Sequence, residues 1–90
     1  MYYALLYDTV PDFVRLREPF RAEHLALAES ARRTGLLVLA GAFDPPDSAL
    51  LVFKAEDPAP VLEFARNDPY VRNGLVTSWR ARPWKVVVGA

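Results

Sequence analysis

The residues best suited to chemistry in this chain are its single histidine, His24, and a downstream carboxylate, Asp68. The unperturbed pKa of a histidine side chain, about 6.5, lies near neutral pH, which suits histidine to general acid or base work. A carboxylate bound to one ring nitrogen fixes the tautomer of the imidazole and raises the basicity of the other nitrogen. If the fold brings them together, His24 and Asp68 form a pair able to transfer a proton.

Both residues also have a purely structural interpretation. A lone histidine on an apolar helix face is more often a packed core residue than a catalytic one. Asp68 precedes Pro69, and an Asp-Pro pair is typical of a helix start, where the aspartate accepts backbone N–H groups. A carboxylate has about four acceptor positions, so capping and binding to His24 are compatible. A second such pair, Asp57-Pro58, has no expected catalytic role and serves as an internal control.

The composition disfavours other kinds of site. The chain has no cysteine, which excludes disulfides, a thiolate nucleophile and a cysteine zinc site. One histidine with scattered aspartates makes no transition-metal cluster, and Asp44 and Asp47 lack the rest of a calcium loop. The glycines form no phosphate-binding loop, and the serines lie in no nucleophile elbow. We therefore expect a site without a metal or other cofactor.

Charge and length limit the expected partners. Lys+Arg and Asp+Glu number 11 each among 90 residues, so the formal net charge is zero. Nucleic-acid binding usually needs a basic excess, so no nucleic-acid partner is expected. The N-terminus does not resemble a signal peptide, and no apolar run approaches the ~18 residues of a membrane span. We expect a cytoplasmic protein without membrane association, built as a single domain over residues 1–90.

The element that must position His24 is an amphipathic helix that begins near Pro19. Arg21 lies about a quarter turn from the apolar stripe of this helix, where it either binds a substrate carboxylate or is simply solvated. Gly35 follows two arginines and is expected to end the helix in a left-handed conformation. The inward stripe consists of Phe20, His24, Leu27 and Ala31.

The remaining segments predict an antiparallel sheet with helices on one face. Helical turns are expected over residues 13–18 and after Asp68, and a second main helix at Asp57-Pro58. The resulting order, β-α-β-β-α-β, is that of a ferredoxin-like α+β sandwich. Apolar runs predict strands over residues 2–7, 36–42, 49–54 and 75–81, and a C-terminal strand over 84–88 after a bend at Arg82-Pro83.

The strands also predict self-association. They are near-continuous apolar runs, which indicates burial on both faces of the sheet. Two helices cover only one face, and a zero net charge does little to keep copies apart. We therefore expect a homodimer that packs sheet to sheet through the open face.

An ordered set of short motifs spans essentially the whole chain and resembles the YciI-like, or YCII-related, family of the dimeric α+β barrel group. The motifs are Arg-x-x-His-Leu on the first main helix, Gly41 at the end of the second strand, Asp-Pro-Tyr after the second main helix, Gly74, and Pro-Trp near the C-terminus. The resemblance implies a ferredoxin-like fold, a barrel formed by two protomers, and a pocket with a histidine–aspartate pair, here His24 and Asp68. Arg21 matches the helix arginine of the family, and Tyr70 the tyrosine of its Asp-Pro-Tyr motif.

The leading hypothesis is a small cofactor-free enzyme that performs isomerisation, elimination or lyase chemistry on a small carboxylated or aromatic metabolite. His24 would transfer the proton, Asp68 would orient it, and the substrate-binding residues would be Arg21, Tyr70 and Gly41. The alternative is a non-catalytic dimeric ligand-binding or regulatory module, in which His24 is fully packed. A pocket bounded by His24, Asp68 and Arg21 would favour the enzyme. Trp79 and Trp84 either line that pocket or pack in the core or dimer interface.

Overall fold

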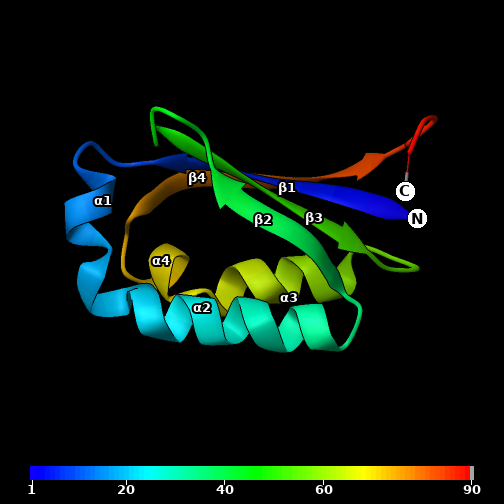
Figure 1. Ribbon diagram of the computed structural model, residues 1–90, viewed down its shortest axis with the longest axis horizontal. Coiled ribbons are helices and arrows are strands. Elements are labelled where there is room, and N and C mark those ends of the chain that lie inside the picture. The colour runs from blue at the N-terminus through cyan, green and yellow to red at the C-terminus, as the bar shows by residue number, and fades with distance from the viewer. Residues whose placement is uncertain (90) are drawn as a thin grey trace.

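The structure has two layers, a four-stranded sheet and a set of helices on one of its faces (Figure 1). The sheet is antiparallel throughout, with the strand order β2-β3-β1-β4. This is the predicted ferredoxin-like α+β arrangement. The computed structural model describes residues 1–89, with β1 (Tyr2–Thr9), α1 (Phe13–Leu16), α2 (Glu18–Arg33), β2 (Leu37–Ala42), β3 (Ser48–Lys54), α3 (Ala59–Asn67), α4 (Pro69–Arg72) and β4 (Val76–Trp84).

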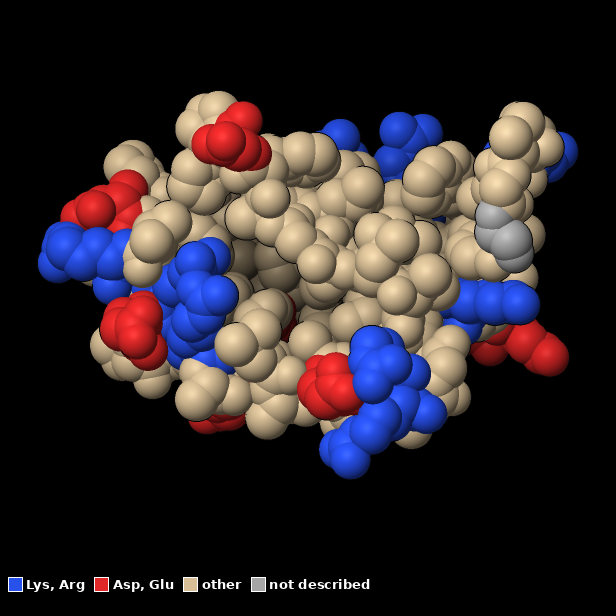
Figure 2. Space-filling model, in the orientation of Figure 1, with Lys and Arg blue, Asp and Glu red and all other residues tan. Residues whose placement is uncertain are grey.

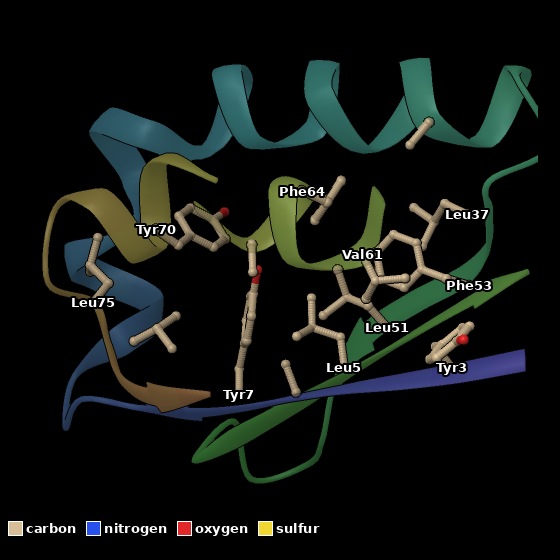
Figure 3. Close-up of a cluster of buried hydrophobic side chains, with 14 of the residues drawn as sticks. Tyr3, Leu5, Tyr7, Leu37, Leu51, Phe53, Val61, Phe64, Tyr70 and Leu75 are labelled. Atoms are coloured by element: carbon tan, nitrogen blue, oxygen red, sulfur yellow. The ribbon is translucent and has the colours of Figure 1, made fainter. Parts of the chain in front are cut away.

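The central strand β1 separates the core from the open face of the sheet. Successive side chains of a strand point to opposite faces. Tyr3, Leu5 and Tyr7 are accordingly buried toward the helices, whereas the residues between them are only half-buried. Figure 3 shows this inward row beneath side chains from β2, β3 and the helices. The partners of the row in the core include Leu37, Leu51, Phe53, Val61, Phe64 and Tyr70.

Helix α2 follows the sequence prediction closely. It begins at Glu18 with Pro19 in its first turn, and it ends at Arg33. Gly35 has a φ angle of 86°, and its N–H and that of the next residue donate to carbonyls in the last turn, at 3.0 Å each. This is the Schellman arrangement that a glycine at this position favours. α2 has 16 residues, and no helix within residues 1–89 is long and apolar enough to cross a membrane.

The C-terminal part of the chain differs from the prediction. The bend at Arg82-Pro83 and the separate strand over residues 84–88 are both wrong, because β4 runs without interruption from Val76 to Trp84 and residues 85–89 form no strand. Pro83 pairs with Tyr3 inside the ladder. β4 is an edge strand, where the missing N–H of a proline can face solvent without loss of a ladder hydrogen bond. Proline therefore ends a central strand but not this one.

Candidate active site

The fold brings His24 of α2 and Asp68 at the start of α4 into direct contact across 44 positions of sequence. Nδ1 of His24 lies 2.9 Å from Oδ1 of Asp68. The Asp68 side chain is 0% exposed, and the His24 side chain retains 14% of its exposure. Nε2 of His24 has no hydrogen-bond partner among residues 1–89. The free ring nitrogen is therefore the one through which His24 can act on a ligand.

Asp68 accepts hydrogen bonds from three elements at once. The Tyr7 hydroxyl of β1 donates to Oδ2 at 2.8 Å, and the Tyr70 backbone N–H donates to Oδ1 at 3.0 Å. His24 supplies the third contact. Asp68 is thus the N-cap of α4, with Pro69 at the first helical position, and a partner of His24 as well. The two interpretations of Asp68 that the sequence left open both hold, because the carboxylate has enough acceptor positions for both.

The sequence prediction missed Tyr7. Burial, together with the neighbouring Asp68 carboxylate, raises the pKa of Tyr7 well above its ordinary value. Its hydroxyl therefore stays protonated and donates to Asp68. One signal was available in the sequence: Tyr7 follows Tyr3 and Leu5 on the inward face of a strand, and a buried tyrosine hydroxyl needs a hydrogen-bond partner. Figure 3 shows Tyr7 rising from β1 toward Tyr70.

Tyr70 packs directly on the imidazole of His24. The two ring centroids lie 3.9 Å apart and the ring planes are 13° from parallel. The ring of Phe13 in turn meets Tyr70 edge-on, at 5.3 Å and 85°. Burial raises the pKa of Tyr70, and the nearby cations of Arg17 and Arg21 act in the opposite direction. Stacking on one side and Asp68 at Nδ1 together hold the His24 ring in one orientation.

A cavity of about 350 Å³ opens between α2 and β2 and reaches His24. This volume lies within the range of small-molecule pockets. Figure 2 shows the hollow, with Lys and Arg side chains beside it at the N-terminal end of α2 and uncharged side chains along β2. Its lining includes the buried apolar side chains of Phe13, Leu37, Ala49 and Leu51, together with the buried rings of Tyr7 and Tyr70.

Most, but not all, of the predicted site residues line the cavity. His24, Arg21, Tyr70 and Gly41 line it. Asp68 does not, because its side chain is fully buried, so the cavity meets the discriminating observation at His24 and Arg21 but reaches Asp68 only through its contact with His24. A Cβ on Gly41 would meet nothing within 4 Å, so packing within the chain does not require glycine there.

The two tryptophans lie outside this cavity. Trp79 is half-buried against the hydrophobic core, and Trp84 is 44% exposed. Arg17, which the sequence prediction did not include, does line the cavity. Its signal was the spacing of residues 17, 21, 24 and 28, which places them on one helix face. Within residues 1–89 no group of three or more His, Cys, Asp and Glu side chains could hold a metal ion.

A four-stranded antiparallel sheet with its helices on one face defines the class of fold, the ferredoxin-like α+β sandwich. Within that class, the model of the YCII-related domain matches residues 1–85, and the chain belongs to this family. It is thus the family that the sequence motifs resemble.

Several solved structures share the fold, two of which are compared with this chain. The 5-chloro-2-hydroxyhydroquinone dehydrochlorinase of Burkholderia phenoliruptrix AC1100, in complex with 2,5-dihydroxybenzoquinone, is 23% identical with a TM-score of 0.79, and 94% of each chain is covered. A protein described as an antibiotic biosynthesis monooxygenase is 16% identical with a TM-score of 0.57, covering 98% of this chain and 100% of that one. No curated protein matches the chain.

Proposed function

We propose that this protein is a small enzyme that performs general acid/base chemistry without a cofactor on a small molecule bound in the α2–β2 cavity. The observation that carries the proposal is the contact between His24 Nδ1 and the fully buried Asp68 carboxylate, at 2.9 Å, at the wall of the cavity. In this arrangement Asp68 holds the proton on Nδ1, and Nε2 keeps a lone pair for the substrate. His24 is the catalytic residue and Asp68 its positioning residue.

The proposed reaction begins with removal of a proton from a carbon next to a carbonyl group. Nε2 of His24 takes the proton, and the C–H electron pair moves into an enolate. The imidazolium that forms is stabilised by Asp68. A conjugated enolate takes the proton back from the imidazolium at another carbon, which is an isomerisation. Alternatively, the enolate expels a leaving group with its electron pair from the adjacent carbon, and the imidazolium returns its proton to that group or to water, which is an elimination. Arg21 holds an anionic group of the substrate in both cases.

Two observations support a small flat substrate. The cavity of about 350 Å³ has aromatic side chains, Phe13 and Tyr70, in its lining and the backbone of Gly41 at its β2 side. The dehydrochlorinase of the same fold was solved with 2,5-dihydroxybenzoquinone, a planar ring compound. The alternative, a module in which His24 is fully packed, is disfavoured because the cavity reaches His24.

Nitrogen NMR of the His24 ring tests the pair without a known substrate. At a pH where the ring is neutral, we expect the proton on Nδ1 and the lone pair on Nε2. Asp68→Asn should disturb this tautomer, because the amide replaces the carboxylate that holds the proton. Asp57→Asn, the same change at the exposed Asp-Pro pair, should leave the signals unchanged. A wild-type ring that carries its proton on Nε2 contradicts the proposal.

Proton exchange in heavy water tests the reaction itself. Small carboxylated and aromatic compounds with acidic C–H bonds are followed by proton NMR in the presence of the enzyme. For the compounds that exchange, we expect His24→Asn and Asp68→Asn to abolish the catalysed rate, with Asp57→Asn as the matched control. Exchange that persists in His24→Asn at the wild-type rate would rule out His24 as the base.

We also propose that two copies of the chain pack through the open face of the sheet. That face carries no helix within residues 1–89 (Figure 1), and its β1–β3 centre is apolar, with half-buried Ala4, Leu6 and Leu50 in paired strands. Leu50→Lys should shift the sedimentation behaviour from dimer to monomer. Val14→Lys is the control, because Val14 is an exposed apolar residue of α1, away from the sheet. A wild-type monomer at micromolar concentration contradicts this proposal.

A further inference from the structure

The N-terminal end of the α2–β2 cavity carries two arginines, Arg17 and Arg21, that form no ion pair with a carboxylate within residues 1–89. We propose that Arg17 and Arg21 form one anion-binding subsite, so that the ligand has a planar oxyanion, such as a carboxylate, at the α1–α2 junction and an apolar ring against His24. The placement of the reacting carbon at His24 rests on the proposed function. The anion subsite itself does not.

The first observation is an unpartnered atom of Arg17. Its Nε is buried and has no hydrogen-bond partner among residues 1–89. A buried N–H of a charged group is costly to leave unpaired, and such groups in native structures call for an explanation. The Arg17 guanidinium lies 5.3 Å from the ring centroid of Phe13, a cation–π contact that holds it in the cavity wall. Arg17 lines the cavity through atoms other than Nε, and a bound acceptor would meet those.

The second observation is a contrast among the arginines around the cavity. Arg32 also lines it, but its guanidinium is paired with Glu29, at 2.6 Å. Arg17 and Arg21 form no ion pair with any carboxylate within residues 1–89. The positive charge available to a ligand is therefore concentrated at one end of the cavity and neutralised at the other. Figure 2 shows the cationic group at the α1–α2 end of the hollow.

The third observation is the distance from this charge to His24. Arg17, Arg21 and His24 follow the i, i+4, i+7 spacing of one helix face, and the backbone of Arg17 is itself helical, with φ −75° and ψ −15°. At about 1.5 Å of rise per residue, Arg21 lies roughly 4.5 Å and Arg17 roughly 10 Å along the axis from His24. Both charges also lower the pKa of the Tyr70 hydroxyl against the effects of burial, Asp68 and Glu18.

The chemistry of the guanidinium defines the ligand. The two Nη groups of an arginine present parallel N–H donors that match the two oxygens of a carboxylate. Arg21 adds a second cation one helical turn away. The apolar side chains that line the cavity suit a ring between this charge and His24. The subsite should therefore select a singly charged aromatic or cyclic acid over its neutral analogue.

Benzoate and benzamide, which share a ring and differ in charge, test the subsite by NMR titration at low ionic strength. We expect benzoate to bind the wild type about tenfold more tightly than benzamide, the size of one charge-assisted hydrogen-bond pair. Arg17→Gln should weaken benzoate binding about tenfold and leave benzamide unchanged. Arg21→Gln should act in the same direction, and because Arg21 is exposed this variant does not threaten the fold. Arg32→Gln, at the neutralised end, should stay within about twofold.

Three results would overturn the subsite: no saturable benzoate binding, equal affinity for the two probes, or equal losses in Arg17→Gln and Arg32→Gln. His24→Asn separates this inference from the proposed function. It should abolish catalysed proton exchange while benzoate still binds within about threefold of wild type, because the anion is held by the arginines and not by the imidazole. Loss of one property without the other thus identifies which proposal fails.

Discussion

Two aspartate–proline pairs precede helices in this protein, and only one of them contacts His24. Oδ1 of Asp57 accepts the N–H of Ala59 at 2.8 Å, and Oδ1 of Asp68 accepts the N–H of Tyr70 at 3.0 Å. The local hydrogen bond is the same in both. Asp57 is exposed and makes no other side-chain contact of this kind within residues 1–89, whereas Asp68 is fully buried between Tyr7 and His24.

The difference shows that burial, and not the motif, gives Asp68 its role. An exposed carboxylate is solvated by water and needs no further partner. A carboxylate removed from water must be compensated by hydrogen bonds and charges, because burying it alone is costly. Tyr7 and His24 provide that compensation, and His24 is thereby oriented toward the cavity. The same cap thus becomes a positioning group when a sheet and a helix enclose it.

The largest expected effect is on the free energy of unfolding, which should fall much more when Asp68 is replaced than when Asp57 is. Asp68→Ala should lower the free energy of unfolding by about 3 kcal/mol or more, because it leaves Tyr7, His24 and the Tyr70 N–H unpaired in the core. Asp57→Ala should cost about 1 kcal/mol, the loss of a cap alone. Urea denaturation of both variants measures the difference. Equal losses would mean that the buried contacts of Asp68 add nothing beyond capping.

The next effect concerns Tyr7 at alkaline pH. The raised pKa of Tyr7 means that the folded state keeps a proton that the unfolded state loses above pH 10. Stability from this group is therefore complete below pH 10 and falls as pH rises, by up to about 1.4 kcal/mol per pH unit. Tyr7→Phe should flatten the decline, measured by denaturation between pH 9 and 11. The half-buried Tyr2 supplies the control Tyr2→Phe, and a decline that is as steep in Tyr7→Phe as in this control contradicts the assignment.

The smallest expected effect is a coupling energy between His24 and each aspartate. In a double-mutant cycle, His24→Asn and Asp68→Asn should be non-additive by about 1 kcal/mol, because their side chains are in direct contact. His24→Asn and Asp57→Asn should be additive within about 0.5 kcal/mol, since the two side chains share no partner. Thermal or urea unfolding of the singles and doubles measures both cycles. A coupling of the same size in the two cycles would remove the distinction between the aspartates.

Much of this protein is predictable from short-range patterns. The inward stripe of α2, the glycine that ends it, the Asp68-Pro69 cap and the order of elements along the chain follow from periodicity and turn chemistry, which depend on neighbouring residues. The predicted Asp57 cap is off by one residue, because α3 has Pro58 at its N-cap. The family also follows from motifs along the chain. The strand after Pro83 was mispredicted because a proline ends a central strand but not an edge strand, and edge position is a property of the sheet.

The sequence by itself determined which residues can do chemistry here, since it offers one imidazole and, at Asp57 and Asp68, two Asp-Pro pairs ahead of predicted helices. Only the tertiary structure decided between those two pairs. It placed Asp68 against His24, brought Tyr7 from a distant strand to the same carboxylate, and left Nε of Arg17 without a hydrogen-bond partner among residues 1–89. The physical reason is that a local pattern sets the backbone hydrogen bonds of a turn or helix end. Burial and long-range contacts set the protonation and orientation of the side chains in a site, and decide which of their polar atoms lack a partner.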